Sequence, residues 1–247
     1  MAMRDEILAQ IQCAELAGSY EQMIKYLKEL IKLDPKLNPE ALQWLSTAYE
    51  RVVGNRRYVW LEMNNENPKP RSSSKFHKFH VDSNPNKVEN EIRHYCREII
   101  NMVTEKLLPI AETLDEKILF YKLLGEYNHY LTEIENGTAC REARDAAIIG
   151  YSTAYELSNG YFASCNPIRL SLILNFSTFR YNILNHYDLA YQMAEQAYSI
   201  ATDELNNLDE EDKPIPMQII QSIRQNLSTW DRESKHRDSH RVRLNSY

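Results

Sequence analysis

Two adjacent arginines, Arg56 and Arg57, are the side chains whose charge could hold an anionic ligand. A guanidinium group can donate two parallel, charge-assisted hydrogen bonds to a phosphate or a carboxylate. The surrounding residues have helical spacing, and a double arginine on a helix more often forms a solvated or ion-paired face than a ligand site. On the residues alone, the ion-paired interpretation is therefore favoured, and binding is the alternative.

An asparagine, Asn175, interrupts the apolar segment Asn166–Asn185. The apolar residues of this segment are too dense for a thin amphipathic stripe, so both sides of the helix are expected to face protein or a groove. A buried amide needs hydrogen-bond partners. The Asn175 amide therefore either bridges neighbouring helices or lines a binding groove, and both interpretations stay open here.

Catalytic and metal-binding signatures are weak in this chain. His77 and His80 form an H-x-x-H pattern that could bind a metal ion, yet no third and fourth ligand accompany it, so we interpret them as solvated loop histidines. No P-loop, GxGxxG, GxSxG or HExxH motif occurs. We therefore disfavour an enzyme, and we expect neither a metal nor a cofactor.

The composition favours a helical, intracellular protein. Only 6 glycines occur among 247 residues, below the roughly 7% of average usage. The four cysteines are scattered without a CxxC pair or signal peptide, which predicts a reduced protein of the cytoplasm, with the nucleus left open. No apolar run approaches the ~20 residues of a membrane span. The net charge of -6 argues against nucleic acid as the main ligand.

Helical spacing of apolar residues recurs along the chain and predicts an all-α fold of about nine antiparallel helices. Asparagine–proline and aspartate–proline pairs near residues 34–39 are typical of helix ends and N-caps. Residues 64–85 contain three prolines and three consecutive serines and are predicted to form a long loop. Later helices are expected near Asn86–Pro109, Leu114–Glu135, Ala139–Ser158, Pro167–Asn185, Tyr187–Leu205 and Ile215–Trp230.

Three segments resemble the 14-3-3 family of phosphopeptide-binding adaptors and follow one another in the family's order. They are Tyr49–Arg57, Asn166–Asn185 and Asn226–Trp230, and the resemblance covers nearly the whole body, Arg4–Trp230. It implies a concave protomer of nine helices. It also implies a noncatalytic function, in which an amphipathic groove binds phosphoserine or phosphothreonine segments of partner proteins.

The resemblance assigns a phosphate pocket. Arg57 and Tyr130 match a phosphate-binding arginine and tyrosine, whereas Glu50 stands at a phosphate-binding lysine and His129 at a second arginine. The family's three fixed positive charges fall to about zero here, because the unperturbed pKa of histidine is about 6.5. Charged hydrogen bonds contribute about 1.5 to 3 kcal/mol each, so phosphate binding is expected to weaken by several powers of ten. We expect His129 to assist more at low pH.

The resemblance also implies a clamp on the ligand backbone and a groove around it. The matching asparagines are Asn175 and Asn226. The matching groove residues are Lys122, Leu174, Ile219 and Trp230, while Asn182 replaces a glutamate and Thr178, Gln218 and Ser222 replace apolar residues. The groove is therefore expected to be wetter and less hydrophobic than in the family.

Family members dimerise through their N-terminal helices, so the resemblance implies a homodimer. Ala14, Leu16 and Ala17 could supply its apolar contact. Of the family's ion pairs, Lys87 and Glu91 remain, but Ser19 and Gln22 stand at the opposing positions. We expect a dimer of lowered affinity, held mainly by apolar burial.

The last residues, 231–247, are interpreted as a flexible basic tail that follows a 14-3-3-like domain at residues 1–230. The tail carries five Lys or Arg against three Asp or Glu. An RxRxxS pattern suited to basophilic kinases places Ser246 next to the last residue, which resembles C-terminal ligands of the family. We hypothesise that phosphorylated Ser246, or less readily Ser239, binds the groove of its own or a neighbouring subunit. The alternative is a disordered basic tail.

Two further readings stay open beside the phosphopeptide adaptor. Glu50 favours a 14-3-3-like scaffold that has lost its dependence on phosphate. A helical-repeat structural protein, whose apparent groove is core, is the second alternative. No 34-residue self-similarity recurs along the chain, which argues against tetratricopeptide repeats.

Overall fold

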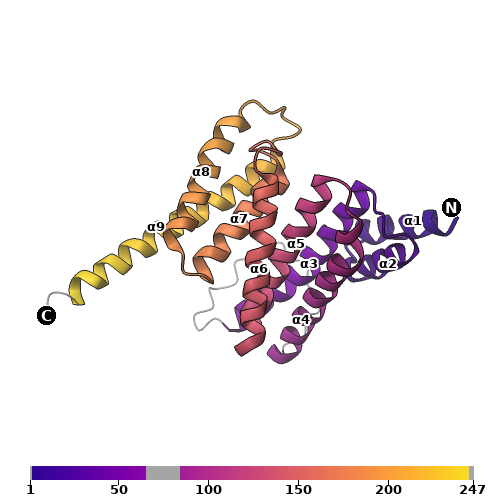
Figure 1. Cartoon of the computed structure of the whole chain (residues 1–247), viewed down its shortest axis with the longest axis horizontal. Coiled ribbons are helices and arrows are strands. Elements are labelled where there is room, and N and C mark those ends of the chain that lie inside the picture. The colour runs from indigo at the N-terminus through magenta and orange to yellow at the C-terminus, as the bar shows by residue number, and fades with distance from the viewer. Residues whose placement is uncertain (1, 65–83, 245–247) are drawn as a thin grey trace. The chain divides into compact units, whose positions relative to one another are not determined.

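The computed structural model describes residues 2–64 and 84–244 (Figure 1), with side chains described up to Arg237. These ranges contain helices and no strand, so the predicted all-α fold is confirmed. A π-helical turn, Val103–Leu107, and a 3-10 turn, Leu108–Ile110, follow the fourth helix. The α-helices are α1 (Ala2–Leu16), α2 (Tyr20–Leu33), α3 (Pro39–Met63), α4 (Pro85–Met102), α5 (Leu114–Ile134), α6 (Gly137–Ser158), α7 (Pro167–Asn182), α8 (Tyr187–Leu205) and α9 (Pro214–Leu244).

The chain divides into two compact units. The first unit contains Met1–Glu116 and Tyr127–Ala146, and the second contains Lys117–Glu126 and Ala147–Tyr247. Helices α1 to α4 therefore lie wholly in the first unit, and α7 to α9 lie wholly in the second. The division runs through α5 and α6, so each of these helices contributes residues to both units.

The first unit is built on α1 to α4, which pack against their neighbours in chain order. Leu27 on α2, Leu45 and Tyr49 on α3 and Ile92 on α4 are almost completely buried. Helix α3 begins as predicted, because Asn38 accepts a hydrogen bond from the Ala41 N–H at 2.8 Å. This start fixes the register of the long helix that carries Glu50, Arg56 and Arg57.

The second unit is built on α7, α8 and α9, each of which packs against the other two. Their core contains Leu170 and Tyr181 from α7, Ala194 from α8, and Ile223 and Trp230 from α9. Burying this apolar face positions the polar residues that alternate with it on α7 and α9.

Helix α7 begins as predicted and ends three residues earlier than predicted. Asn166 caps it, accepting hydrogen bonds from the N–H groups of Ile168 and Arg169, at 2.9 and 3.2 Å. After Asn182 the chain leaves the helix, because Asn185 takes the left-handed conformation with φ 56°. Asparagine tolerates that conformation better than most residues.

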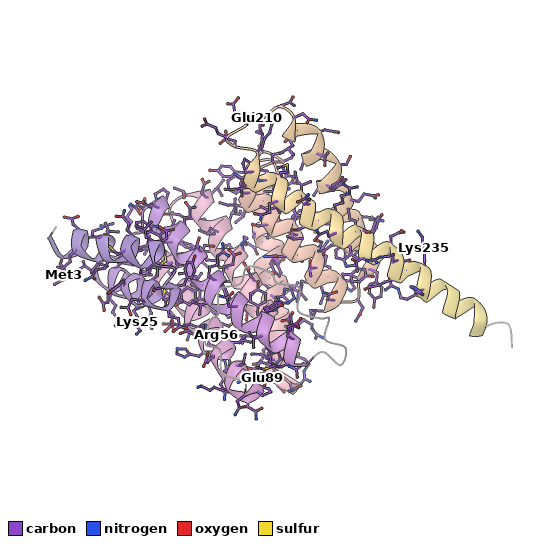
Figure 2. The ribbon with its side chains drawn as sticks, turned by 180° about the vertical axis from the view of Figure 1, so that it is seen from behind. Met3, Lys25, Arg56, Glu89, Glu210 and Lys235 are labelled. Carbon is purple, nitrogen blue, oxygen red and sulfur yellow. The ribbon has the colours of Figure 1, made fainter. Side chains whose placement is uncertain are left out.

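Helix α9 continues past Trp230, the residue at which the sequence predicts its end. It runs from Pro214 to Leu244, so the expected helix end at Trp230 is wrong. No glycine or proline occurs after Pro216 to break the helix. Asp231 and Lys235, one turn apart, form an ion pair at 2.7 Å (Lys235 is labelled in Figure 2). The charged composition that suggested a tail is therefore compatible with a helix.

Two predicted regions lie wholly or mostly outside the described residues. The predicted loop at 64–85 is described only at its ends, where α3 stops at Met63 and α4 begins at Pro85 after the N-cap Asn84. The H-x-x-H histidines, His77 and His80, fall outside the description.

Candidate functional site

Arg57 lies in the first unit, where α3 meets the C-terminal half of α5. Its guanidinium forms a fork with the Glu133 carboxylate: Nη2 donates to Oε1 at 2.5 Å, and Nε donates to Oε2. The Arg57 Cζ lies 4.7 Å from the centroid of the Tyr130 ring. The predicted pair of Arg57 and Tyr130 is therefore brought together, with a carboxylate as a third member that the sequence analysis missed.

His129 completes this group, which we call the Arg57 cluster: Arg57, His129, Tyr130 and Glu133. The His129 side chain is almost fully buried, and its Nε2 lies 3.7 Å from Glu133 Oε1. Burial, and then the positive charge of Arg57, lower the pKa of His129 to about 3. A pKa lowered in this way leaves the imidazole neutral near pH 6, which argues against the prediction that His129 assists binding at mildly low pH.

Glu50 lies on the same face of α3 as Arg57, two turns earlier. Seven residues separate the two positions, which corresponds to a rise of roughly 10 Å and almost two full turns of α-helix. The Glu50 side chain is exposed. With His129 neutral, the positive charge of Arg57 is set against the negative charges of Glu50 and Glu133, so the local charge is less favourable to phosphate than the sequence predicts.

Arg56, the neighbour of Arg57, has a structural role. It is buried, and its Nη2 donates to Glu21 Oε1 at 2.6 Å while Nε donates to Glu91 Oε2 at 2.7 Å (Arg56 is labelled in Figure 2). The guanidinium also lies 4.9 Å from the Tyr95 ring. The ion-paired interpretation of the double arginine is therefore confirmed for Arg56, which ties α2, α3 and α4 together.

Lys122 lies on the part of α5 that belongs to the second unit. Its Nζ donates to Glu126 Oε2 at 3.1 Å, one turn further along, and both side chains are about nine-tenths buried. Removing one partner of such a pair leaves a buried, uncompensated charge. Lys122 thus has a carboxylate partner within its own helix.

The two clamp asparagines lie on neighbouring helices of the second unit, Asn175 on α7 and Asn226 on α9. Asn226 Nδ2 donates to Thr178 Oγ1 at 3.0 Å, and Thr178 Oγ1 donates to the Leu174 carbonyl at 2.7 Å. Both asparagines are partly exposed. Thr178, noted in the sequence only as the replacement of an apolar residue, therefore joins the two helices at this point.

The other predicted groove residues differ in exposure. Leu174 and Ile219 are partly buried against the core of the second unit, and Trp230 lies inside that core. Trp230 stacks on Tyr181 with a centroid distance of 4.5 Å. Asn182 and Gln218 are exposed, and Ser222 donates to the Gln218 carbonyl at 3.1 Å. The hydroxyl protons of Thr178 and Ser222 are donated to carbonyls of their own helices. These two residues therefore offer fewer hydrogen-bond donors to water than the prediction of a wetter groove assumes.

The residues after Trp230 contact α7 and α8 within the second unit. The Tyr181 hydroxyl donates to Glu233 Oε2 at 2.8 Å and accepts from Arg237 Nη1 at 3.1 Å. The Arg237 guanidinium lies 4.0 Å from the centroid of the Tyr187 ring. We call this group, which consists of Tyr181, Tyr187, Glu233 and Arg237, the Arg237 contact. Of the two serines proposed for phosphorylation, Ser246 lies outside the described residues, and the side chain of Ser239 is not described.

Among the described residues, no His, Cys, Asp and Glu side chains gather in a way that could hold a metal ion. Within the same ranges, no helix is long and apolar enough to cross a bilayer.

The model of the 14-3-3 protein family matches residues 10–231. The chain belongs to the 14-3-3 family, whose members are non-enzymatic adaptors. The resemblance seen in the three sequence segments is thereby confirmed.

Relatives in plants, animals and fungi share about a third of the residues. The 14-3-3-like protein RA215 of Solanum tuberosum is 34% identical over 92% of this chain and 90% of the relative. The 14-3-3 protein epsilon of Drosophila melanogaster is 32% identical over 93% and 88%. The checkpoint signal transducer rad24 of Schizosaccharomyces pombe is 32% identical over 94% and 87%. Family membership supports an adaptor role in binding phosphorylated protein segments.

Proposed function

We propose that this chain is an adaptor that holds phosphorylated segments of partner proteins through Arg57 and Tyr130, with a phosphate pocket weaker than the family's. The observation that carries the proposal is the fork between Arg57 and Glu133 beside the Tyr130 ring. It supports the proposal because a carboxylate and a phosphate accept the same paired hydrogen bonds from a guanidinium. The Arg57 side chain keeps 28% of its surface exposed, which leaves room for an incoming oxyanion.

Glu133 competes with the phosphate in this proposal. An incoming phosphate must share or displace the Glu133 carboxylate, and Glu50 repels it from the same face of α3. Neutral His129 supplies no charge to offset them. The same three observations favour the second candidate, an adaptor that binds unphosphorylated segments.

We expect Glu133→Gln to strengthen binding of phosphoserine peptides by about five- to tenfold, because it removes the competing charge but keeps a side chain of the same size. Binding is measured with matched phosphorylated and unphosphorylated members of a peptide library, by fluorescence anisotropy. Arg57→Gln should reduce the preference for phosphate by about tenfold.

The matched control is Glu135→Gln, which removes another α5-end carboxylate that pairs with Arg93 and Arg97, at 2.9 and 2.8 Å. It should leave the phosphate preference unchanged. Equal binding of both peptide forms to the unmodified chain and to both Arg57 and Glu133 variants would reject phosphate recognition and establish the second candidate.

We also propose a homodimer of lowered affinity. Family membership supports dimerisation. Leu16, at the end of α1, exposes 89% of its surface and is available for an apolar contact. Glu91, expected to help hold the dimer, is instead engaged by Arg56 within the same chain. This use of Glu91 within its own chain, with Ser19 and Gln22 at the opposing positions, supports the lowered affinity.

The C-terminal residues are proposed to bind a neighbouring copy when Ser246 is phosphorylated. Leu244 follows Asn226 by eighteen helical residues on α9, a rise of about 27 Å. Three residues can extend by only about 10 Å. A return to Asn226 on the same chain would require the last turns of α9 to unwind, so binding to a second copy is the simpler arrangement.

For this tail proposal, we expect treatment with a basophilic kinase to strengthen the concentration-dependent association of the full chain beyond that of the untreated chain, measured by sedimentation. A chain ending at Arg237 should show no such gain, because it keeps the Arg237 contact but lacks Ser246. Ser246→Ala should behave like the shortened chain, and Ser239→Ala should behave like the full one. An unmodified Ser246 after treatment, or equal association of all four, would contradict the proposal.

A further inference from the structure

One threonine hydroxyl links the main chain of α7 to the side chain of Asn226 on α9. Thr178 Oγ1 lies 2.7 Å from the Leu174 carbonyl oxygen and 3.0 Å from Asn226 Nδ2. All three residues belong to the second unit, and α7 and α9 are in contact there. The link therefore rests on two packed helices and does not depend on any other part of the chain.

The geometry fixes which way the Asn226 amide faces. A hydroxyl has one proton, and the carbonyl of Leu174 can only accept it. Thr178 must then act as the acceptor toward Asn226, so the amide presents Nδ2 to Thr178 and turns Oδ1 away. In the reverse orientation, the Thr178 hydroxyl would have to give up its hydrogen bond to the Leu174 carbonyl in order to donate to Asn226 Oδ1.

Neighbouring polar residues lack such a link. Asn175, on the same face of α7, makes no hydrogen bond through its side chain within the described structure. Ser222, one turn before Asn226, donates to the Gln218 carbonyl of its own helix and not to α7. Asn226 is thus the clamp asparagine whose amide is held in one orientation before any ligand arrives.

We propose that Thr178 is a positioning residue for ligand binding, which orients Asn226 so that Oδ1 accepts a backbone N–H of the bound segment. The inference rests on the proposed adaptor function, and it adds that the α7–α9 face contacts the backbone of the bound segment. It adds a specificity rule, because a proline or an N-methylated residue at the position facing Asn226 lacks the required proton. Preorganisation of the acceptor lowers the entropy lost on binding.

The test measures peptide binding to Thr178→Val, Thr178→Ser, Asn226→Ala and the Thr178→Val/Asn226→Ala double variant of the full chain. The probe is the tightest-binding member of a peptide library, in phosphorylated or unphosphorylated form. We expect Thr178→Val to weaken binding about fivefold, and Thr178→Ser to stay within about twofold of the unmodified chain. In the Asn226→Ala background, Thr178→Val should cause no further loss, because its effect acts through Asn226.

A scan of N-methylated versions of the same peptide identifies the proton that Asn226 accepts. N-methylation at one position of the peptide should weaken its binding to the unmodified chain by about tenfold. The same methylation should weaken binding to the Thr178→Val variant by clearly less. Ser171→Ala is the matched control, since Ser171 also donates to its own helix at Ile168 but makes no link to α9. It should bind the peptide as the unmodified chain does.

The outcomes separate this inference from the proposed function. Independent losses that multiply in the double variant, or unchanged binding by Thr178→Val, would overturn the role of Thr178 while leaving the adaptor function intact. Failure of every library member to bind the unmodified chain would overturn the adaptor function, and the positioning role with it.

Discussion

Glu50→Lys should strengthen binding of a phosphoserine peptide by roughly ten- to a hundredfold and leave the unphosphorylated peptide unaffected. The substitution replaces a negative charge on the Arg57 face of α3 with a donor, and a charged hydrogen bond contributes about 1.5 to 3 kcal/mol. Two helical turns separate positions 50 and 57, a distance that a lysine and an arginine can bridge through one phosphate. Titration calorimetry with the matched peptide pair, at two salt concentrations, measures the effect.

Glu62→Lys is the control for this experiment. It makes the same change in net charge on the same helix, but position 62 faces away from Arg57. A similar gain from both substitutions would attribute the effect to net charge and not to the pocket. No gain from Glu50→Lys, combined with measurable binding of the unphosphorylated peptide, would indicate that phosphate does not approach this face of α3.

The same charges explain why the candidate site cannot be assigned from a motif alone. The sequence supplies an arginine pair at the expected place, yet Arg56 and Arg57 differ in burial and in their partners. Arg56 is enclosed by Glu21 and Glu91, whereas Arg57 keeps part of its surface exposed beside Glu133. The motif predicts where arginines stand on α3, and long-range packing decides which one can meet a ligand.

Local signals made most helices predictable. A cap and its following proline are adjacent in sequence, so the starts of α3 after Asn38 and of α7 after Asn166 could be read directly. Partners far apart in sequence could not be read in this way. Glu133 lies 76 residues after Arg57, and nothing in the spacing of either residue indicates that they meet.

The end of α9 shows a different limit of the sequence. High charge favours a flexible tail, but charge does not by itself interrupt a helix when no glycine or proline is present. The stack of Trp230 on Tyr181, in the core of the second unit, is a further contact that the sequence does not indicate. Composition and family position describe a residue's type but not its neighbours.

His129 should make the chain sensitive to acid. Its pKa is about 3 in the folded chain, against about 6.5 when unfolded. Between these two values the unfolded chain binds more protons, so the free energy of unfolding falls as the pH falls through this range. Above pH 6.5 His129 is neutral in both states and contributes no pH dependence. At about 1.4 kcal/mol per pH unit, the loss reaches about 3 kcal/mol at pH 4.

We expect His129→Gln to remove this loss, because glutamine stays neutral at every pH. Urea unfolding of both chains, at pH 7 and pH 4, gives the difference directly, since titration of the carboxylates is common to the two and cancels. His94→Gln, which alters an exposed histidine on α4, should keep the full acid sensitivity. If His129→Gln and the unmodified chain lost the same stability on acidification, His129 would have to be protonated in the folded state. The Arg57 cluster would then carry a second positive charge at low pH, and binding of phosphopeptides should strengthen there.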